Sequence, residues 1–285
     1  ADAGGFAQAE VSLGLGLSTI SGQMKALEDR LGLSLCSRGR AGFRLTEAGE
    51  AVLAEARGLI AASEGFSARV AGLRDRLAGP VRIGFVDATL GDANARLVQA
   101  LAAFAAEAPE AEIRLSARPP DELLRGVTEG ALDVAVGSFP RVALGLGYAD
   151  LYRERHHFFA GRDHPLYALP DAQIDFEAVR RHRLVARSYW GSRDIKGFAG
   201  TRVGAVVTEM EAEAMLILTG AFLGYLPVPY AAAWVAEGRM RPLAPARFAY
   251  TAPFQLAWRP DRLAVPRIAA LVAALRRAHA GYSAT

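Results

Sequence analysis

The sequence predicts a two-lobed α/β protein that follows a small helical segment and one long helix. Residues 1–45 form short helical pieces separated by glycine, a proline-free helical pattern runs over Thr46–Leu77, and strands alternate with helices after Gly79-Pro80. The Gly-Pro pair is the clearest boundary, because proline and the residue before it both resist helix. The predicted domains are therefore 1–45, 46–79 and 80–285.

The composition excludes several classes of protein. Of 285 residues, 52% are hydrophobic and 22% are charged, which is typical of a folded globular chain. No apolar run reaches the roughly 18 residues of a membrane span, and no secretory leader is visible. We therefore expect a cytoplasmic protein with no membrane partner. The single cysteine, Cys36, excludes a disulfide framework and a cysteine-rich metal site.

The first segment has the pattern of a helix–turn–helix. Two short helices are expected at Phe6–Leu13 and Ser18–Leu31, joined by a turn with glycines at 14 and 16. Ser18 is expected to cap the second helix. Its polar face carries short hydrogen-bonding side chains that can reach base edges, and its opposite face carries the apolar residues Ile20, Met24, Leu27 and Leu31. The residues of the polar face expected to bind DNA are Ser18, Thr19, Ser21, Gln23 and Lys25.

A basic hairpin is expected after these helices. Arg38, Arg40 and Arg44 fall within seven residues around two glycines, as in a hairpin that touches phosphates. Between Ser18 and Leu45 five cations and two anions leave a net charge of +3, which equals the excess of the whole chain. The alternative is a solvated helix and a basic loop that do not bind DNA.

The long helix predicts self-association. Apolar residues recur in two sets spaced by seven, which together form a heptad seam. A helix of about 30 residues is some 45 Å long, more than one small domain covers. We expect this helix to pair with a second copy, the alternative being a helix that lies on its own domain. The seam residues singled out are Val52, Ala56, Leu59, Phe66, Val70 and Leu73.

From residue 80 the elements alternate regularly. The first unit is expected as βαβαβ, which implies a parallel sheet; its elements are Val81–Asp87, Asp92–Glu107, Glu112–Arg118, Asp121–Glu129 and Asp133–Gly137. The second unit is expected to contain strands at Tyr152–Ala160, Arg183–Arg187, Arg202–Val207 and Phe222–Val228, with helices at Phe176–His182, Glu209–Thr219 and Pro229–Glu237. A last strand, Phe254–Trp258, and a last helix, Pro266–His279, are free to return to the first unit. Lobe 1 is thus predicted over 80–145 and 250–285, and lobe 2 over 146–249.

Motifs of enzymes and metal sites are not found in the sequence. There is no Walker lysine, no H-E-x-x-H and no G-x-S-x-G, and LGLGLS lacks the third glycine of a dinucleotide fingerprint. His156 and His157 are adjacent in an expected strand, so their side chains leave opposite faces and do not ligate one metal. These histidines and His164 are expected to be surface or hydrogen-bonded residues, and Cys36 a small core residue. No cofactor and no metal are predicted, and the chain is not expected to be an enzyme.

One long segment resembles a known family. The stretch STISGQMKALEDRLGLSLCSRGRAGFRLTEAGE, Ser18–Glu50, is similar to the recognition helix, the LE-x-x-LG-x-x-L turn, the wing and the LT-x-x-G motif of LysR-type transcriptional regulators. RIGF, GALDVAVG, DHPL and GYLP follow in the family's order, so the resemblance covers essentially the whole chain.

The resemblance implies a winged helix–turn–helix, a dimerising linker helix and an effector domain like periplasmic binding proteins. It also implies a dimer of dimers on promoter DNA, with Arg38 on a phosphate and Ser18, Thr19, Ser21 and Gln23 in the major groove. Three features depart from the family: Gly22 stands where arginine is frequent, Cys36 replaces a phenylalanine, and only ADAGG remains of a first helix, the rest of which we expect outside this sequence.

The resemblance places a small-molecule effector between the lobes, and residues at strand ends suggest its site. A capping box, Thr208 with Glu211, opens a helix after a strand, and Arg118 ends another strand. Helix N–H groups beside an arginine favour a carboxylate, and aromatic walls favour a flat body, so a small or aromatic carboxylate is expected. The alternative is that these residues only cap and pack. The candidate effector residues are Thr89, Arg118, Ser188, Tyr189, Trp190 and Thr208.

Three functions are compatible with this architecture. The sequence favours a ligand-responsive transcription regulator, with promoter DNA, an effector and further copies of itself as partners. A solute-binding protein of the same two-lobed fold is the second, which the helix–turn–helix argues against. An enzyme on the same fold is the third, and no nucleophile–base pair supports it.

Overall fold

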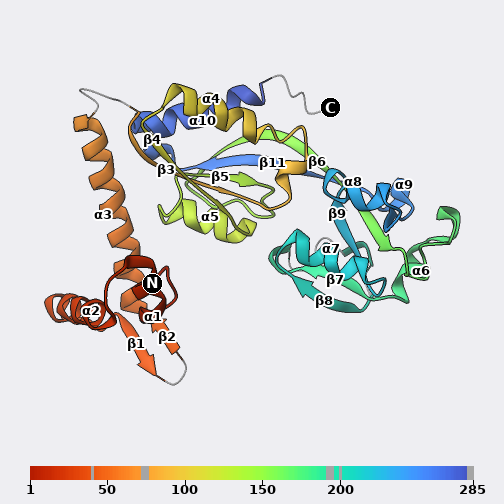
Figure 1. Cartoon of the computed structure of the whole chain (residues 1–285), viewed down its shortest axis with the longest axis horizontal. Coiled ribbons are helices and arrows are strands. Elements are labelled where there is room, and N and C mark those ends of the chain that lie inside the picture. Colours follow the sequence, from red (N-terminus) through yellow and green to blue (C-terminus); the bar gives the residue numbers. More distant parts are fainter. Residues whose placement is uncertain (40–41, 72–76, 191–195, 199–200, 281–285) are drawn as a thin grey trace. The chain divides into compact units, whose positions relative to one another are not determined.

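The computed structural model describes residues 1–39, 42–71, 77–190, 196–198 and 201–280. Contacts divide the chain into two compact units, 1–64 and 65–285, each described here by itself (Figure 1). The expected Leu73 and Arg40 lie outside the described residues. Among the described residues, no helix is long and apolar enough to span a membrane.

The first unit consists of helices and one hairpin. It contains α1 (Phe6–Leu13), α2 (Leu17–Leu31), β1 (Cys36–Gly39), β2 (Gly42–Leu45) and the start of α3 (Glu47–Ala71). Ser18 does not cap α2, so that prediction was wrong: the helix begins one residue earlier, after Gly16. The side chain of Glu10 accepts a hydrogen bond from the Leu17 amide at 3.2 Å, which satisfies this end of the helix instead.

Thr46 and Gly49 join the hairpin to α3. The Thr46 hydroxyl accepts a hydrogen bond from the Gly49 amide at 2.9 Å and donates one to the Ser34 carbonyl at 2.6 Å. A side chain at residue 49 would place its Cβ 1.9 Å from the Leu35 carbonyl oxygen, so only glycine fits. The LT-x-x-G motif therefore combines a helix cap with a close backbone approach.

The second unit is built on one mixed sheet. Its strand order is β4-β3-β5-β11-β6-β9-β7-β8, and β10 pairs with β6. The predicted βαβαβ unit is confirmed, since β3 pairs in parallel with both β4 and β5. Its strands and helices are β3 (Gly79–Phe85), α4 (Leu97–Glu107), β4 (Ala111–Ala117), α5 (Pro120–Thr128) and β5 (Val134–Gly137). The helix expected from Asp92 begins at Leu97, because Asp92 bonds the Asn94 amide in a turn that follows a 3₁₀ segment, Thr89–Gly91.

The remaining elements complete both lobes. Two strands are longer than predicted: β6 spans Gly147–Gly161 and β11 spans Tyr250–Trp258. Lobe 2 also contains a short strand and a short helix that the sequence did not predict, β10 (Met240–Pro242) and α9 (Pro245–Phe248). The other elements are α6 (Phe176–Arg180), β7 (Leu184–Arg187), β8 (Val203–Val207), α7 (Met210–Leu218), β9 (Leu223–Pro227), α8 (Val228–Ala236) and α10 (Pro266–Ala278).

Two strands pass from one lobe into the other. Strand β6 pairs with β11 over Gly147–His156 and with β9 over His156–Ala160. Helix α10 returns to pack on α4, and Figure 1 shows these helices on one side of the lobe 1 strands with α5 on the other. The two lobes have separate apolar cores, so the residues between them are free to form a polar cleft.

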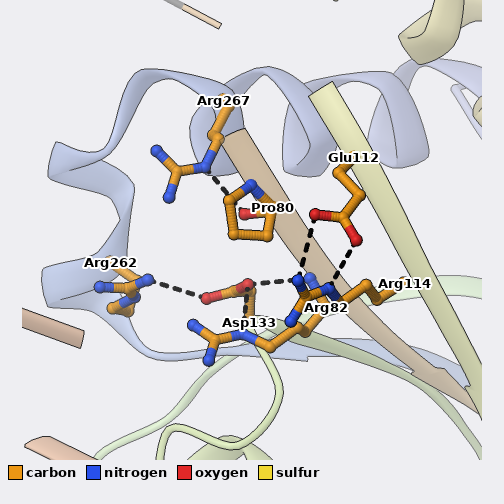
Figure 2. A network of polar contacts seen from close by, with 7 residues as sticks. All are labelled: Pro80, Arg82, Glu112, Arg114, Asp133, Arg262 and Arg267. Carbon is orange, nitrogen blue, oxygen red and sulfur yellow. Dashed lines mark hydrogen bonds and ion pairs between the residues drawn. The ribbon is translucent and has the colours of Figure 1, made fainter. Parts of the chain in front are cut away.

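A buried carboxylate, Asp133, connects β3 of lobe 1 to the segment before α10, where the chain returns to this lobe (Figure 2). It accepts hydrogen bonds from the Arg82 amide at 2.9 Å and from Nη2 of Arg262 at 2.9 Å, and forms an ion pair with Nε of Arg82 at 3.3 Å. Nearby, Nε of Arg267 donates to the Pro80 carbonyl at 2.8 Å. The Glu112–Arg114 pair in the same view is exposed.

Asp133→Ala is expected to lower the free energy of unfolding by about 3–5 kcal/mol, because it leaves buried guanidinium charge uncompensated. Urea unfolding of the full chain measures this loss. The matched variant Glu112→Ala removes a carboxylate from an exposed pair and is expected to change the urea midpoint little. Equal losses in the two variants would contradict the role given to Asp133.

Candidate functional site

Helix α2 exposes the polar residues predicted to meet DNA. Ser18, Thr19, Gln23 and Lys25 are exposed, whereas Ser21 is half-buried. The apolar stripe predicted on the opposite face is only partly buried: Ile20 is 9% exposed, but Leu27 and Leu31 are 41% and 44% exposed. The described elements of the first unit therefore do not cover that side of α2.

The wing is an antiparallel hairpin in the same unit. Cys36 pairs with Leu45, Ser37 with Arg44, and Gly39 with Gly42. The Arg44 side chain is exposed, and Arg38 lies on β1, opposite Phe43. Cys36 is buried, as expected of a small core residue, and its amide donates to the Glu28 carboxylate at 3.3 Å. Glu28 also accepts from the Leu35 amide at 2.7 Å, so α2 and the start of the hairpin are tied together.

The seam of the long helix is partly open. Val52 and Ala56 are half-buried, while Leu59 and Phe66 are 72% and 62% exposed. Val70 belongs to α3, whose description ends at Ala71. Pairing through this seam stays a prediction.

A cavity of about 320 Å³ lies where the two lobes face each other. Among the predicted effector residues, it brings together Arg118 from the end of β4 and Thr208 from the start of α7. Arg118 is the one cation among its described lining residues, which also include three carboxylates. The full lining is Asp87, Ala88, Ala117, Arg118, Pro119, Thr208, Glu209, Glu211 and Tyr230.

Thr208 does not cap α7, so the capping box predicted for it was wrong. The helix has Glu209 at its N-cap position, and no side chain of its own segment satisfies its first turn. Instead Asp87, beyond the end of β3 in lobe 1, accepts a hydrogen bond from the Met210 amide at 2.6 Å. Burial raises the pKa of Asp87, although the Met210 bond and Arg187 both oppose this rise. The helix terminus expected to receive a carboxylate thus already holds one.

The other predicted effector residues are dispersed. Thr89 is buried and donates its hydroxyl to the Val86 carbonyl at 2.6 Å, and it lines a different, mainly apolar cavity beside α4. Ser188 is exposed, and Tyr189 lines a smaller cavity between the lobes. Trp190 ends the short 3₁₀ turn that contains both, and its side chain lies outside the described part of the chain.

The buried ion pair Arg187–Glu213 contributes Arg187 to the lining of the smaller cavity. Arg187 is 2% exposed; its Nε donates to Glu213 Oε2 at 2.8 Å, its Nη1 donates to the Tyr250 hydroxyl at 3.1 Å, and its Nη2 donates to the Tyr225 carbonyl. Glu213 also accepts from the Tyr225 amide at 2.9 Å. The nearby Glu213 carboxylate raises the pKa of Arg187 against the opposing effect of burial. The pair therefore stays charged and fixes β7, β9 and α7 together.

A second acid–base pair, Glu154 and His156, lines the smaller cavity. Glu154 and His156 are buried, and Glu154 Oε2 lies 2.8 Å from His156 Nε2. Burial, together with the charge of Asp92, raises the pKa of Glu154 to about 8. Burial also holds the pKa of His156 well below its ordinary value, with Arg187 adding to the effect. His156 is thus a hydrogen-bonded residue, as predicted, and no group of three or more metal-binding side chains occurs among the described residues.

Comparison with known proteins decides the family. Residues 1–50 match the family described as bacterial regulatory helix-turn-helix protein, lysR family, and residues 74–280 match the LysR substrate binding domain. The chain belongs to the LysR family of transcriptional regulators.

Similar proteins align with nearly the whole length of this chain. The HTH-type transcriptional activator BauR of Pseudomonas aeruginosa is 38% identical over 92% of this chain and 86% of its own. The structure of a full-length OxyR variant from Pseudomonas aeruginosa has a TM-score of 0.63 at 20% identity, covering 98% of this chain and 93% of that one. Full-length CbnR in complex with its target DNA has a TM-score of 0.52 at 23% identity, covering 98% and 96%.

These matches place the regulator among DNA-binding transcription factors and not among enzymes. The family combines a DNA-binding unit with an effector-binding domain, as the sequence predicted. A solute-binding protein without DNA binding is not favoured, because the N-terminal match is to the regulatory helix–turn–helix.

Sequence analysis did not find the cleft residues Glu154, Arg187 and Glu213 of the regulator. Along β6, Glu154 and His156 alternate with Arg153 and Arg155, so both faces of the strand are polar and neither is marked as buried. A charged residue that ends the apolar strand Leu184–Arg187 was the one signal available.

Glu154→Gln is expected to change how stability depends on pH. The folded protein keeps a proton on Glu154 up to a pKa of about 8, whereas the unfolded chain loses it near 4.5, so wild-type stability falls as pH rises between these values. Glutamine carries no titrating proton, so the free energy of unfolding of the variant should rise by about 3 kcal/mol relative to that of the wild type between pH 5.5 and 8. Urea unfolding at both pH values measures the gain. A difference that stays constant with pH would exclude a protonated Glu154.

Proposed function

We propose that this regulator binds promoter DNA as a dimer through α2 and the β1–β2 wing, and that a small molecule between its lobes changes this binding. The observation that carries the proposal is the exposed polar face of α2, which stands beside a basic wing in a unit matching the regulatory helix–turn–helix. Ordinary recognition helices present such short polar groups to base edges. The cytoplasm, where the chromosome lies, is the compartment this function requires.

The residues divide between base and phosphate contacts. We assign Ser18, Thr19, Ser21 and Gln23 to the major groove, because their side chains are short donors and acceptors on the first turns of α2. The cations Lys25, Arg38, Arg40 and Arg44 are assigned to the DNA backbone.

Dimerisation is assigned to the linker helix. The exposure of Leu59 and Phe66 on α3 supports a seam that a second copy covers. The proposed division is a DNA-binding domain over 1–45, a linker helix over 46–79 and an effector domain over 80–285, and tetramers are proposed to form from such dimers.

The effector is assigned to the 320 Å³ cavity, and a carboxylate is proposed as one of its groups. Arg118 supports this choice, because it is the cation among the described lining residues. The α7 terminus does not add to it, since Asp87 already occupies the Met210 amide. Tyr230 offers an aromatic wall to the same cavity.

The DNA-binding proposal is tested with the full-length protein and the intergenic DNA beside its own gene, by fluorescence anisotropy across a salt series. Gln23→Ala is expected to lower the preference over a scrambled duplex by about 1–3 kcal/mol. Arg44→Ala should weaken binding to both duplexes alike and reduce the salt slope by about one. Arg239→Ala, which removes an exposed cation from lobe 2, is the matched control and should change neither. No preference of the wild type over the scrambled duplex would overturn the local-promoter proposal.

The carboxylate proposal is tested by thermal shift with a panel of small aliphatic and aromatic carboxylates. Arg118→Ala should reduce the affinity for any carboxylate that binds by about tenfold or more, since a charge-assisted hydrogen bond is lost. Binding that is unaffected by Arg118→Ala would place the carboxylate elsewhere.

A further inference from the structure

Three polar side chains form a row on β6 where this strand passes between the lobes. Tyr152, Glu154 and His156 are two residues apart, so they share one face of the sheet. Opposite them on β11 stand Phe254, Ala252 and Tyr250 in register. The row therefore lies on β6, paired with β11, on the two strands that pass between the lobes.

Two polar atoms of this row are buried without a hydrogen-bond partner. They are the Tyr152 hydroxyl and His156 Nδ1, in residues that are each 2% exposed, and no described residue bonds either atom. His156 is also one of the residues that line the smaller cavity. Such atoms are costly to bury, by about 1–3 kcal/mol each, unless another group satisfies them.

The smaller cavity has the size of one polar head group. Its volume of about 20 Å³ is room for a group as large as one water molecule. The rings of Tyr189, Tyr250 and Phe254 contribute to its lining, and aromatic faces attract cations.

The charges around this cavity favour a cation. Glu154 lies on its floor, and the charges of Asp87 and Asp92 both act on Glu154. The cation in the lining, Arg187, is already engaged by Glu213, Tyr225 and Tyr250. These carboxyl groups would repel an additional anion, whereas they would attract an ammonium group.

We propose that this cavity, here named the Glu154 pocket (Glu154 and His156 with the rings of Tyr189, Tyr250 and Phe254), receives a protonated amine of the effector. The Glu154 carboxylate is the counter-ion, and His156 Nδ1 accepts a hydrogen bond from the ammonium. The inference rests on the proposed function. With a carboxylate on Arg118 in the adjoining cavity, the effector is a zwitterion, and its chemical class is an amino acid.

Binding is coupled to a proton. With its pKa near 8, Glu154 is largely protonated at pH 7 before the amine arrives. The carboxyl then gives its proton to solvent and forms a carboxylate–ammonium pair, so about one proton is released per amine bound. The titratable and charged groups that act on Glu154 or its row are Asp87, Asp92, His156, His157, Arg187 and Tyr152.

The test is isothermal titration of the full-length protein with straight-chain amino acids of two to six carbons. Each is compared with the acid that lacks the amine and with its N-acetyl derivative, neither of which carries a positive charge. At least one amino acid should bind, and both of its counterparts should bind tenfold or more weakly. Titration at pH 7 in two buffers of different ionisation enthalpy should show release of close to one proton.

Variants separate recognition from folding. Glu154→Gln should weaken amino acid binding by roughly tenfold to hundredfold and abolish the proton release. Tyr152→Phe removes a hydroxyl that has no described partner and that belongs to no lining residue of the cavity, so it should leave binding unchanged and stability unchanged or raised. The exposed control Glu177→Gln should change neither quantity.

Three results would overturn the amine pocket: equal binding of the acid lacking the amine, unchanged binding by Glu154→Gln, or no binding by any member of the series. If the protein still prefers its promoter over a scrambled duplex, the amine pocket alone fails. If that preference is missing as well, the proposed function fails with it.

Discussion

Strand β6 is paired with β11 on one side of the cleft and with β9 on the other, and this continuity determines what the lobes enclose. A side chain on the middle of β6 has no apolar core above it, because each lobe buries its own core to one side. Polar residues are therefore tolerated at this point, provided that they are paired. Glu154 pairs with His156, and Arg187 pairs with Glu213. This part of the cleft is thus a set of ionisable groups in a low dielectric, where each added or removed proton has a large effect.

The contact of Asp87 with the Met210 amide has a second consequence. It links the loop after β3 in lobe 1 to the first turn of α7 in lobe 2, so the helix dipole is compensated across the cleft. Asp87 lines the larger cavity and Met210 lines the smaller one, so this hydrogen bond lies where the two approach each other. A molecule that occupies both cavities would contact the same bond, which gives the regulator a physical connection between ligand and lobe geometry.

In the DNA-binding unit, hydrogen bonds to backbone groups join the elements to one another. Glu28 holds the two amides at the start of β1, while Thr46 and Gly49 hold the start of α3 against Leu35. The hairpin and the recognition helix are consequently fixed through backbone groups. This leaves the side chains of Gln23 and Arg44 exposed to a partner.

By itself, the sequence determined the order of most elements, the helix–turn–helix, the basic hairpin and the parallel βαβαβ unit, because these follow from local periodicity, glycine turns and proline breaks. It also assigned Arg118 and Thr208 to one effector site, through the resemblance to a family with an effector between two lobes, and the structure brings both residues to one cavity. Only the tertiary structure decided that Asp87 replaces Thr208 at α7, and that Glu154, His156 and Arg187 share a cavity. Asp87 and Met210 are 123 positions apart in the chain, and on β6 both faces are polar, so no local pattern marks the buried one. Burial and pairing across the lobes, which give these groups their chemistry, exist only once the sheet has formed.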